Sequence, residues 1–430
     1  MSMDINRIKC FLFFTFCFLI TGIYAQEQPA FYFKDAIEKN RSAEYHNIVN
    51  NGIIKSLSFP LTDSTEDAWE DAFGAIELIQ YKSSWCDSRI QIAFDSVEKR
   101  SSDFQHALLE LAYANYPGRF HQEVSKLLEQ TNDEKIFALC AEQLRRTDSS
   151  QKMKAYILSQ LEVHNNLFGW YQKPDNVSVI LSNSFFKQKK LPADKMLLPF
   201  LSKGFMKKNV VVYSIQRKNR DFPGIVIIKD TSGNFIKNKD GSIFYVPQLA
   251  RSISNLPFYL TNGNTPQGIF RMYGFAVSGA NFIGPTQNIQ LSMPFETSIR
   301  HFLKDSTITD TAWTEYLYKK LLPVALQDYL PLYESYYASQ AGRTEIIAHG
   351  TTVNPQYYEG KPYYPQTPTE GCLCTKEIWS RQDGERLESD QQKLIDGVKK
   401  AGGADGYYIV IEIDNQRKPV NIEEILPFIK

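Results

Sequence analysis

The chain has no excess of charge of either sign and little cysteine, and each absence excludes a class of protein. Its 430 residues include 48 Lys plus Arg and 48 Asp plus Glu, which gives a formal net charge of zero. Without a global positive field, nothing favours binding to nucleic acid or to an anionic membrane. Six cysteines are too few to form a disulfide scaffold in a chain of this length. The length itself predicts about two or three folded domains.

Long apolar runs are also scarce, and the most marked one lies near the N-terminus. Arg7 and Lys9 precede an uncharged run from Phe11 to Ile20, and the small residue Ala25 follows. This order is typical of a secretory signal, so we expect cleavage after Ala25 and export to the periplasm or cell envelope. The alternative is an uncleaved anchor helix. It is disfavoured because the run is shorter than the ~20 residues that span a bilayer.

Removal of residues 1–25 would leave the cysteines Cys86, Cys140, Cys372 and Cys374. Cys86 and Cys140 lie in helical patterns, where they are most simply read as small buried apolar side chains. A disulfide between these two is an alternative that the sequence leaves open.

Residues 26–190 have the pattern of a helical domain. Apolar residues recur at helical spacing from about Ser64 to His164, and Ser64 followed by Asp67 predicts the N-cap of the first strong helix. Short breakers separate the segments, which favours antiparallel neighbours or a solenoid of helix pairs. With no nucleophile–base pair, this domain is expected to be structural or to bind a protein partner. Further helices are predicted at Phe104–Tyr113, Phe120–Leu128, Glu134–Leu144 and Lys152–Val163.

Residues 195–430 change character, and β-branched and aromatic runs become frequent. Thr311–Ala341, rich in tyrosine, is predicted to be helical, and Ser389 with Gln392 predicts a capped helix that ends at Gly402-Gly403. The fold class is therefore α+β, with an all-helical domain followed by a mostly β domain that has helical insertions. Strands are predicted at Asn209–Ile215, Gly224–Ile228, Ile269–Phe275, Thr344–Ala348 and Tyr407–Ile413.

The stretch Thr369-Glu370-Gly371-Cys372-Leu373-Cys374 carries the most informative chemistry. A nucleophilic cysteine reacts as the thiolate and needs a base nearby, and a preceding glycine lets a carbonyl approach backbone N–H donors. The best candidate for the base is His349, which follows a predicted strand and precedes Gly350. A cysteine and a histidine alone would more often be a buried side chain and a turn residue.

A third element strengthens this reading. Thr265-Pro266-Gln267-Gly268 forms a predicted turn from which a strand leaves. With His349-Gly350-Thr351 and Thr369-Glu370-Gly371-Cys372, and in this order, it resembles the L,D-transpeptidase catalytic domain, the YkuD-like family. The similarity covers about Asn209 to Asp414.

The resemblance implies that Cys372 attacks a peptide carbonyl in a peptidoglycan stem peptide and that His349 takes its proton. It implies catalytic roles for Gly371 and Thr369, the latter or a neighbour supplying the carbonyl that orients the imidazole. It implies no cofactor and no metal. Substrate contacts are expected from Gly350, Thr351, Glu370, Leu373 and Cys374. Two positions depart from the family, which usually has His where this chain has Glu370 and Arg or Asn where it has Cys374.

Several alternatives stay open at this point. Cys372 and Cys374 with His349 could bind zinc, although no fourth ligand is evident. The two cysteines could instead form a disulfide. The acyl group could pass to water, as in an L,D-carboxypeptidase, or the domain could bind cell wall without catalysis. Transpeptidation is favoured because Tyr357–Pro365 and Thr311–Ala341 offer material to cover the site.

Overall fold

The computed structural model describes residues 31–186, 190–353, 359–360 and 369–429. Within it, Tyr32–Lys430 form one compact unit. The predicted signal segment lies outside the described residues, as does most of the predicted covering loop Tyr357–Pro365. No helix in the described part of the chain is long and apolar enough to cross a membrane.

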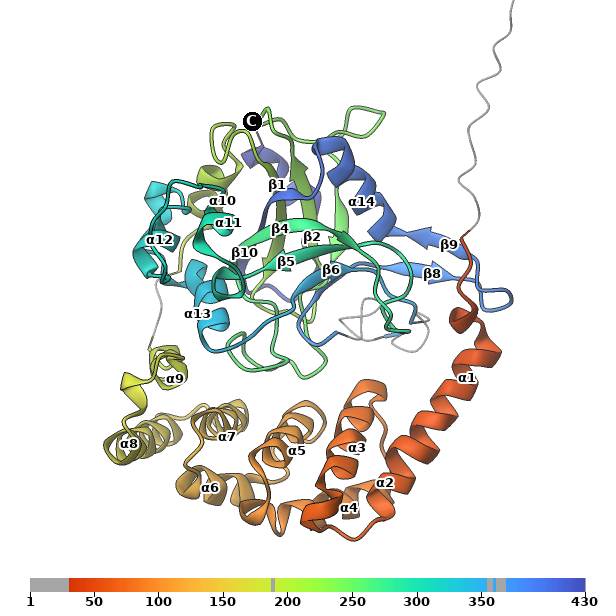
Figure 1. The fold of residues 1–430 in the computed structure, drawn as a ribbon, viewed down its shortest axis with the longest axis vertical. Coiled ribbons are helices and arrows are strands. Elements are labelled where there is room, and N and C mark those ends of the chain that lie inside the picture. Colours follow the sequence, from red (N-terminus) through yellow and green to blue (C-terminus); the bar gives the residue numbers. More distant parts are fainter. Residues whose placement is uncertain (1–30, 187–189, 354–358, 361–368, 430) are drawn as a thin grey trace, which may run out of the picture. The chain divides into compact units, whose positions relative to one another are not determined.

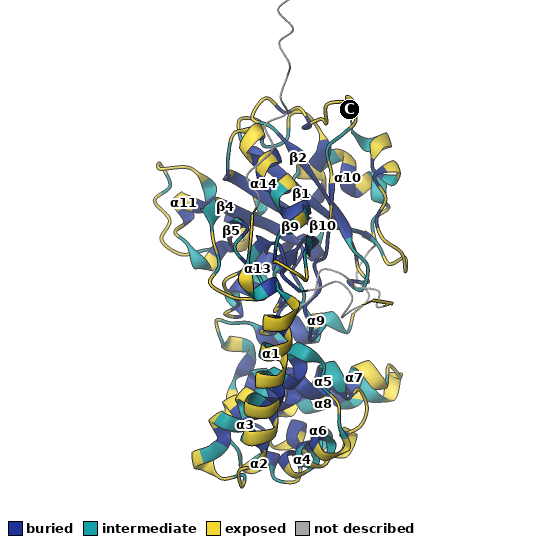
Figure 2. Ribbon diagram, turned by 90° about the vertical axis from the view of Figure 1, so that its right-hand side faces the viewer, coloured by how far each residue is buried: buried dark blue, intermediate teal, exposed yellow. Residues whose placement is uncertain are grey.

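The first part of the compact unit is helical, as predicted, and precedes the first strand (Figure 1). Every helix predicted here is present, and its ends lie within a few residues of the predicted ones. Helices α2 to α9 bury a common core that includes Trp69, Phe73, Phe104 and Phe137. Figure 2 shows α1 as largely exposed. The helices are α1 (Glu38–Asn47), α2 (Ser56–Ser58), α3 (Glu66–Ile79), α4 (Ser84–Phe94), α5 (Ser102–Asn115), α6 (His121–Gln130), α7 (Glu134–Thr147), α8 (Gln151–Phe168), α9 (Val177–Ser184) and α10 (Ala193–Leu201).

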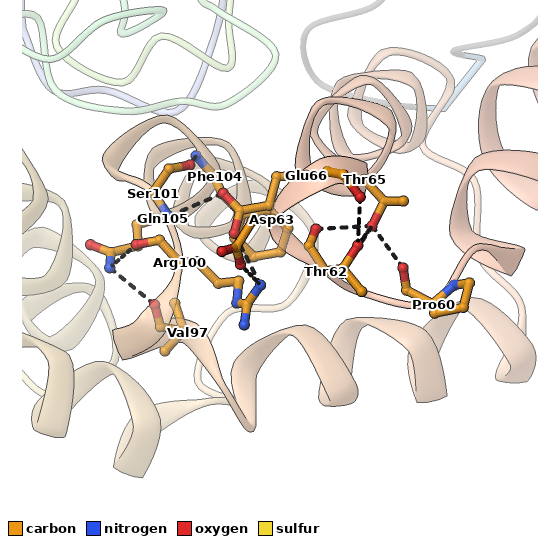
Figure 3. Close-up of polar contacts among 11 residues, drawn as sticks. Pro60, Thr62, Asp63, Thr65, Glu66, Val97, Arg100, Ser101, Phe104 and Gln105 are labelled. Carbon is orange, nitrogen blue, oxygen red and sulfur yellow. Dashed lines mark hydrogen bonds and ion pairs between the residues drawn. The ribbon is translucent and has the colours of Figure 1, made fainter.

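The predicted N-cap at Ser64 is wrong, because α3 begins at Glu66 after a tight turn (Figure 3). The Thr65 hydroxyl closes that turn, since its oxygen accepts the N–H of Thr62 at 2.9 Å and caps nothing in α3. Glu66 instead accepts the N–H of Ser101 at 3.1 Å. Ser101 is the N-cap of α5, so the start of α3 is fixed against the start of α5.

An eight-stranded sheet follows, with the order β3-β2-β1-β10-β4-β5-β6-β7 (Figure 1). β1 pairs with β10 in parallel, β6 pairs with β7 in parallel, and the other pairs are antiparallel. A separate two-stranded sheet joins β8 to β9. The strands are β1 (Val210–Arg217), β2 (Gly224–Lys229), β3 (Val246–Gln248), β4 (Gly268–Ala276), β5 (Asn288–Ser292), β6 (Ile347–His349), β7 (Leu373–Cys374), β8 (Glu377–Trp379), β9 (Arg386–Ser389) and β10 (Asp405–Asp414).

Both faces of the large sheet are buried, which explains why its central strands read as continuous apolar runs. In β1, Val211 and Tyr213 pack in one core cluster with α10, while Val210 and Val212 pack in another with α14 (Asp390–Ala401). The Ser389 hydroxyl accepts the N–H of Gln392 at 2.8 Å and caps α14, as predicted.

Two predictions in this part need correction. The predicted helix Thr311–Ala341 is broken into α12 (Glu315–Lys319) and α13 (Glu334–Gln340), joined by short 3-10 turns. Pro323 and Pro331 lie between them, and proline lacks the N–H that a continuous helix needs. The predicted strand Thr344–Ala348 is shorter, because Glu345 has a φ of 63° that no strand accommodates. A third helix of this part, α11 (Ile299–Leu303), was not predicted.

Candidate active site

The sheet brings the predicted base and nucleophile segments side by side at its β6–β7 edge. Ala348 lies opposite Leu373 and His349 lies opposite Cys374 in the parallel pair. Cys372 immediately precedes β7 and His349 ends β6. The two segments that carry the predicted base and nucleophile therefore lie side by side.

The Cys372 thiol is half-buried against the backbone that leads into β6. Its sulfur donates to the carbonyl of Glu345 at 3.6 Å. Burial raises the pKa of the thiol to about 11, although the N–H of Ile347 acts in the opposite direction. At neutral pH the sulfur is thus protonated, and it needs a base to become a nucleophile.

His349 has the ionisation state that such a base requires. Only 2% of its surface is exposed, and burial lowers the pKa of the imidazole to about 4. Nδ1 lies 2.5 Å from the carbonyl oxygen of Gly350. Because a carbonyl only accepts, Nδ1 carries the proton and Nε2 keeps its lone pair. No hydrogen bond joins this ring to Cys372 among the described residues, so a proton transfer between them would require a closer approach than the structure has.

Gly350 holds the imidazole in a turn that has no room for a side chain. A Cβ atom at Gly350 would lie 2.4 Å from Oε2 of Glu377. Glu377 is fully buried, accepts from the Thr286 hydroxyl at 2.7 Å, and has its pKa raised to about 7 by burial. Sequence reasoning did not find Glu377. The glycine after His349 was the available signal that something packs closely there.

The predicted turn Thr265–Gly268 also contacts the loop Thr369–Cys372, which we call the nucleophile loop. The Thr265 hydroxyl donates to the carbonyl of Gly371 at 2.8 Å and is itself buried. Gly268 has a φ of 131°, and a Cβ there would lie 2.4 Å from the Ser335 hydroxyl oxygen. The Thr-Pro-x-Gly segment therefore supports the loop that carries Cys372.

Gly371 is confined from two sides. Its φ is 109°, and a Cβ there would lie 2.3 Å from a guanidinium nitrogen of Arg343 and 2.4 Å from the carbonyl oxygen of Gly263. Arg343 is buried and donates to the carbonyls of Gly263 and Asn264, both at 2.8 Å. Its charge favours the thiolate form of Cys372 and so acts to lower the pKa of that thiol. No sequence pattern marked Arg343, because its role depends on two loops that fold over it.

Thr369 is near the site but does not orient the imidazole. Its hydroxyl donates to the carbonyl of Arg251 at 2.7 Å, and its carbonyl accepts the N–H of Ile253 at 2.8 Å. Thr369 therefore anchors the nucleophile loop, while the carbonyl that holds the ring belongs to Gly350.

The residues that were predicted to contact substrate differ in how far they are buried. Glu370 is exposed beside Cys372. The side chains of Thr351, Leu373 and Cys374 are fully buried. The Cys374 sulfur packs 3.8 Å from the carbonyl oxygen of Gly350, beneath the histidine turn. Substrate contact through these three side chains therefore does not fit the geometry.

The cysteines and the acidic residues also bear on the open alternatives. Cys86, Cys140, Cys372 and Cys374 are free thiols, so neither proposed disulfide forms. Within the described ranges, no cluster of three or more His, Cys, Asp or Glu residues is arranged to hold a metal ion. Comparisons of this chain with protein family models, with curated proteins and with solved structures found no match.

Proposed function

We propose that this protein is an exported cysteine acyltransferase with a YkuD-like catalytic domain, which carries out L,D-transpeptidation on peptidoglycan stem peptides. One observation carries the proposal. The segments of Thr265, His349 and Cys372 meet at one sheet edge, and the imidazole there is neutral with its Nδ1 bound to a backbone carbonyl. A protonated thiol and a neutral imidazole, carried by segments that lie side by side, are the starting states for acyl transfer through a thioester.

The chemistry follows from the protonation states. As the Cys372 sulfur attacks the donor carbonyl carbon, its proton passes to Nε2 of His349. The tetrahedral intermediate then collapses, the C–N bond breaks, and the leaving amine takes that proton from Nε2. An amine of a second stem attacks the thioester and gives its proton to Nε2, and the departing sulfur finally regains it. The buried charge of Arg343 would favour the anionic sulfur at both stages.

The alternative outcome at the second stage is hydrolysis, which would make the protein an L,D-carboxypeptidase. The thioester is the same in both cases, and only the acceptor differs. Transpeptidation would require the site to exclude water for long enough that an amine can compete for the thioester. A non-catalytic wall-binding module is the alternative of another class, and it would not need a reactive Cys372.

The test is to incubate the purified mature chain with tetrapeptide-bearing muropeptides and analyse the products by mass. Cross-linked dimers or exchange of the terminal D-amino acid are expected. Cys372→Ala and His349→Ala should each abolish both products, while the matched Cys374→Ser variant should retain most activity because that sulfur is buried. Tripeptide stems alone would indicate the carboxypeptidase. Stems left unchanged by the wild-type protein would refute the proposal.

A further inference from the structure

A second candidate site lies where the helical part meets the nucleophile loop. It is a cavity of about 260 Å³, lined by residues of α3, α5, the loop between β3 and β4, and the segment Thr369–Glu370. Thr369 and Glu370 directly precede Gly371 and Cys372 in the chain, so part of the cavity wall belongs to the loop that carries the proposed nucleophile. We name it the acidic pocket after its four glutamates, Glu70, Glu77, Glu110 and Glu370.

Glu77 is the residue that points to a ligand. It lines the pocket with only 9% of its surface exposed. In the described parts of the chain, no hydrogen bond or ion pair involves its carboxylate. Burial raises its pKa well above the ordinary value, and the negative charges of Glu110 and Glu370 act in the same direction. A buried carboxyl group without a partner is costly, and a bound cation would relieve that cost.

Glu110 faces the same cavity and is similarly placed. It accepts a single hydrogen bond of 3.2 Å from the Asn262 amide, and Nδ1 of His106 lies 3.7 Å away. Burial raises the pKa of Glu110 to about 8 and lowers the pKa of His106 below its ordinary value. His106 is therefore neutral near pH 7 and does not balance the negative charge.

The nearby arginines are engaged elsewhere. Arg343 gives its hydrogen bonds to loop carbonyls, and Arg251 pairs with Asp221 at 2.8 Å. Both act from a distance to lower the pKa of a pocket glutamate, Arg251 at Glu77 and Arg343 at Glu110. Neither is among the residues that line the cavity. Among the described residues, the lining of the pocket is consequently rich in carboxyl groups and includes no lysine or arginine.

The positions of the pocket glutamates favour an organic ammonium group over a metal ion. The described residues offer no convergent set of three ligands for a metal ion, so the glutamates are spread around the cavity. Leu78, Ala107 and Ile253 add apolar surface between them. Spread carboxyl groups with apolar walls suit an ammonium group at the end of an aliphatic chain, which needs several acceptors and a dry contact for its methylenes.

We propose that the acidic pocket binds a primary ammonium group on an aliphatic chain, with Glu77 and Glu110 as its principal acceptors. The identity of the ligand rests on the proposed function, in which the ammonium is a free side-chain amine of the peptide substrate. The pocket then selects amine-bearing peptides and holds them beside the Cys372 loop.

The experiment measures binding to the full mature chain by titration calorimetry at low salt. The probe is Nα-acetyl-lysine N-methylamide, and its Nε-acetylated form is the uncharged match. Wild-type protein should bind the charged probe saturably and the acetylated probe at least tenfold more weakly. Glu77→Gln should weaken the charged probe at least tenfold. Asp71→Asn removes one negative charge from the exposed face of the same helix, outside the cavity, and should leave the affinity unchanged.

Two outcomes would overturn the proposal: equal binding of the two probes, or unchanged affinity in both Glu77→Gln and Glu110→Gln. If a variant does not fold, the proposal can still be tested on the wild-type protein by measuring proton release on binding. Binding of an ammonium to protonated carboxyl groups releases protons, so the measured enthalpy should change with the ionisation enthalpy of the buffer; no change would count against the site. If the probe binds but the stem peptides do not change, the acidic pocket is supported and the proposed function is refuted. If the stem peptides are turned over but the probe does not bind, the proposed function is supported and the pocket proposal is refuted.

Discussion

The buried imidazole of His349 makes the stability of the protein depend on pH in a calculable way. Its pKa falls from 6.5 to about 4 on folding because burial disfavours the charged ring. Between these values the unfolded chain binds the proton and the folded chain does not, so stability from this group rises with pH. The contribution is complete above pH 6.5 and lost as pH falls toward 4. A shift of this size corresponds to about 3 kcal/mol.

Other buried groups act in the opposite sense and would obscure the effect in the wild-type protein alone. Burial raises the pKa of Glu110 and of Glu334 to about 8. Their stabilising contribution is present below the unfolded value and is lost as pH rises through the folded value. The informative quantity is therefore the difference between wild type and His349→Gln, in which these terms cancel. Glutamine keeps an N–H that can donate to the Gly350 carbonyl.

The assay is urea unfolding of both proteins at pH 4, 5, 6 and 7, with linear extrapolation to water. Between pH 7 and pH 4, the wild type should lose about 3 kcal/mol relative to the variant. NMR titration of the ring, assigned through the same variant, should give a midpoint near pH 4. A constant difference in unfolding free energy, or a ring that titrates near 6.5, would refute the assignment of His349 as a buried neutral base.

Three further predictions concern the nucleophile loop. Gly371→Ala should cost about 3 kcal/mol in urea unfolding, against about 1 kcal/mol for Gly241→Ala, because both positions have positive φ but only the first lacks space for a Cβ. Equal costs would contradict the crowding at Gly371. Thr265→Val should remove the hydrogen bond to the Gly371 carbonyl, cost about 1 kcal/mol and slow turnover of stem peptides. Alkylation of Cys372 by iodoacetamide, read by mass against Cys372→Ala, should keep accelerating until about pH 11, and a plateau near pH 8.5 would contradict the buried thiol.

The strands of the central sheet were predictable because local composition and burial agree there. β1 and β10 are buried on both faces, so Val210–Arg217 and Asp405–Asp414 carry nearly continuous apolar and β-branched runs. The predicted ends differ by only one or two residues. β7 has two residues and β3 has three, which is too short to leave any periodic signal.

The candidate site was predictable only where one residue type is chemically necessary. Cys372, His349 and Gly371 could be named as candidates because the expected chemistry needs a nucleophile, a base and a close-packed glycine, and because their order resembles that of a known family; their catalytic roles stay predictions. Arg343 could not, because its hydrogen bonds go to carbonyls some 80 residues earlier in the chain. Glu377 is likewise defined by its packing against Gly350 and not by any neighbour in sequence.

The helical part was expected to be structural or to bind a protein partner, and its contacts connect it to the loop that supports the candidate site. Tyr259, in the loop before the Thr-Pro-x-Gly segment, donates to the buried Glu142 of α7 at 2.7 Å. From the same loop, Asn262 donates to Glu110 of α5. Leu256 and Leu260 are buried in the core of the helices.

This loop therefore has two sets of contacts, one to the helices and one to the nucleophile loop through Thr265 and Arg343. A change in the helical core would shift the carbonyls that Arg343 holds and thus the support of Gly371. In the proposed enzyme, the sheet supplies the nucleophile and the base. The helices supply carboxyl groups that would select amine-bearing peptides for binding beside these two residues.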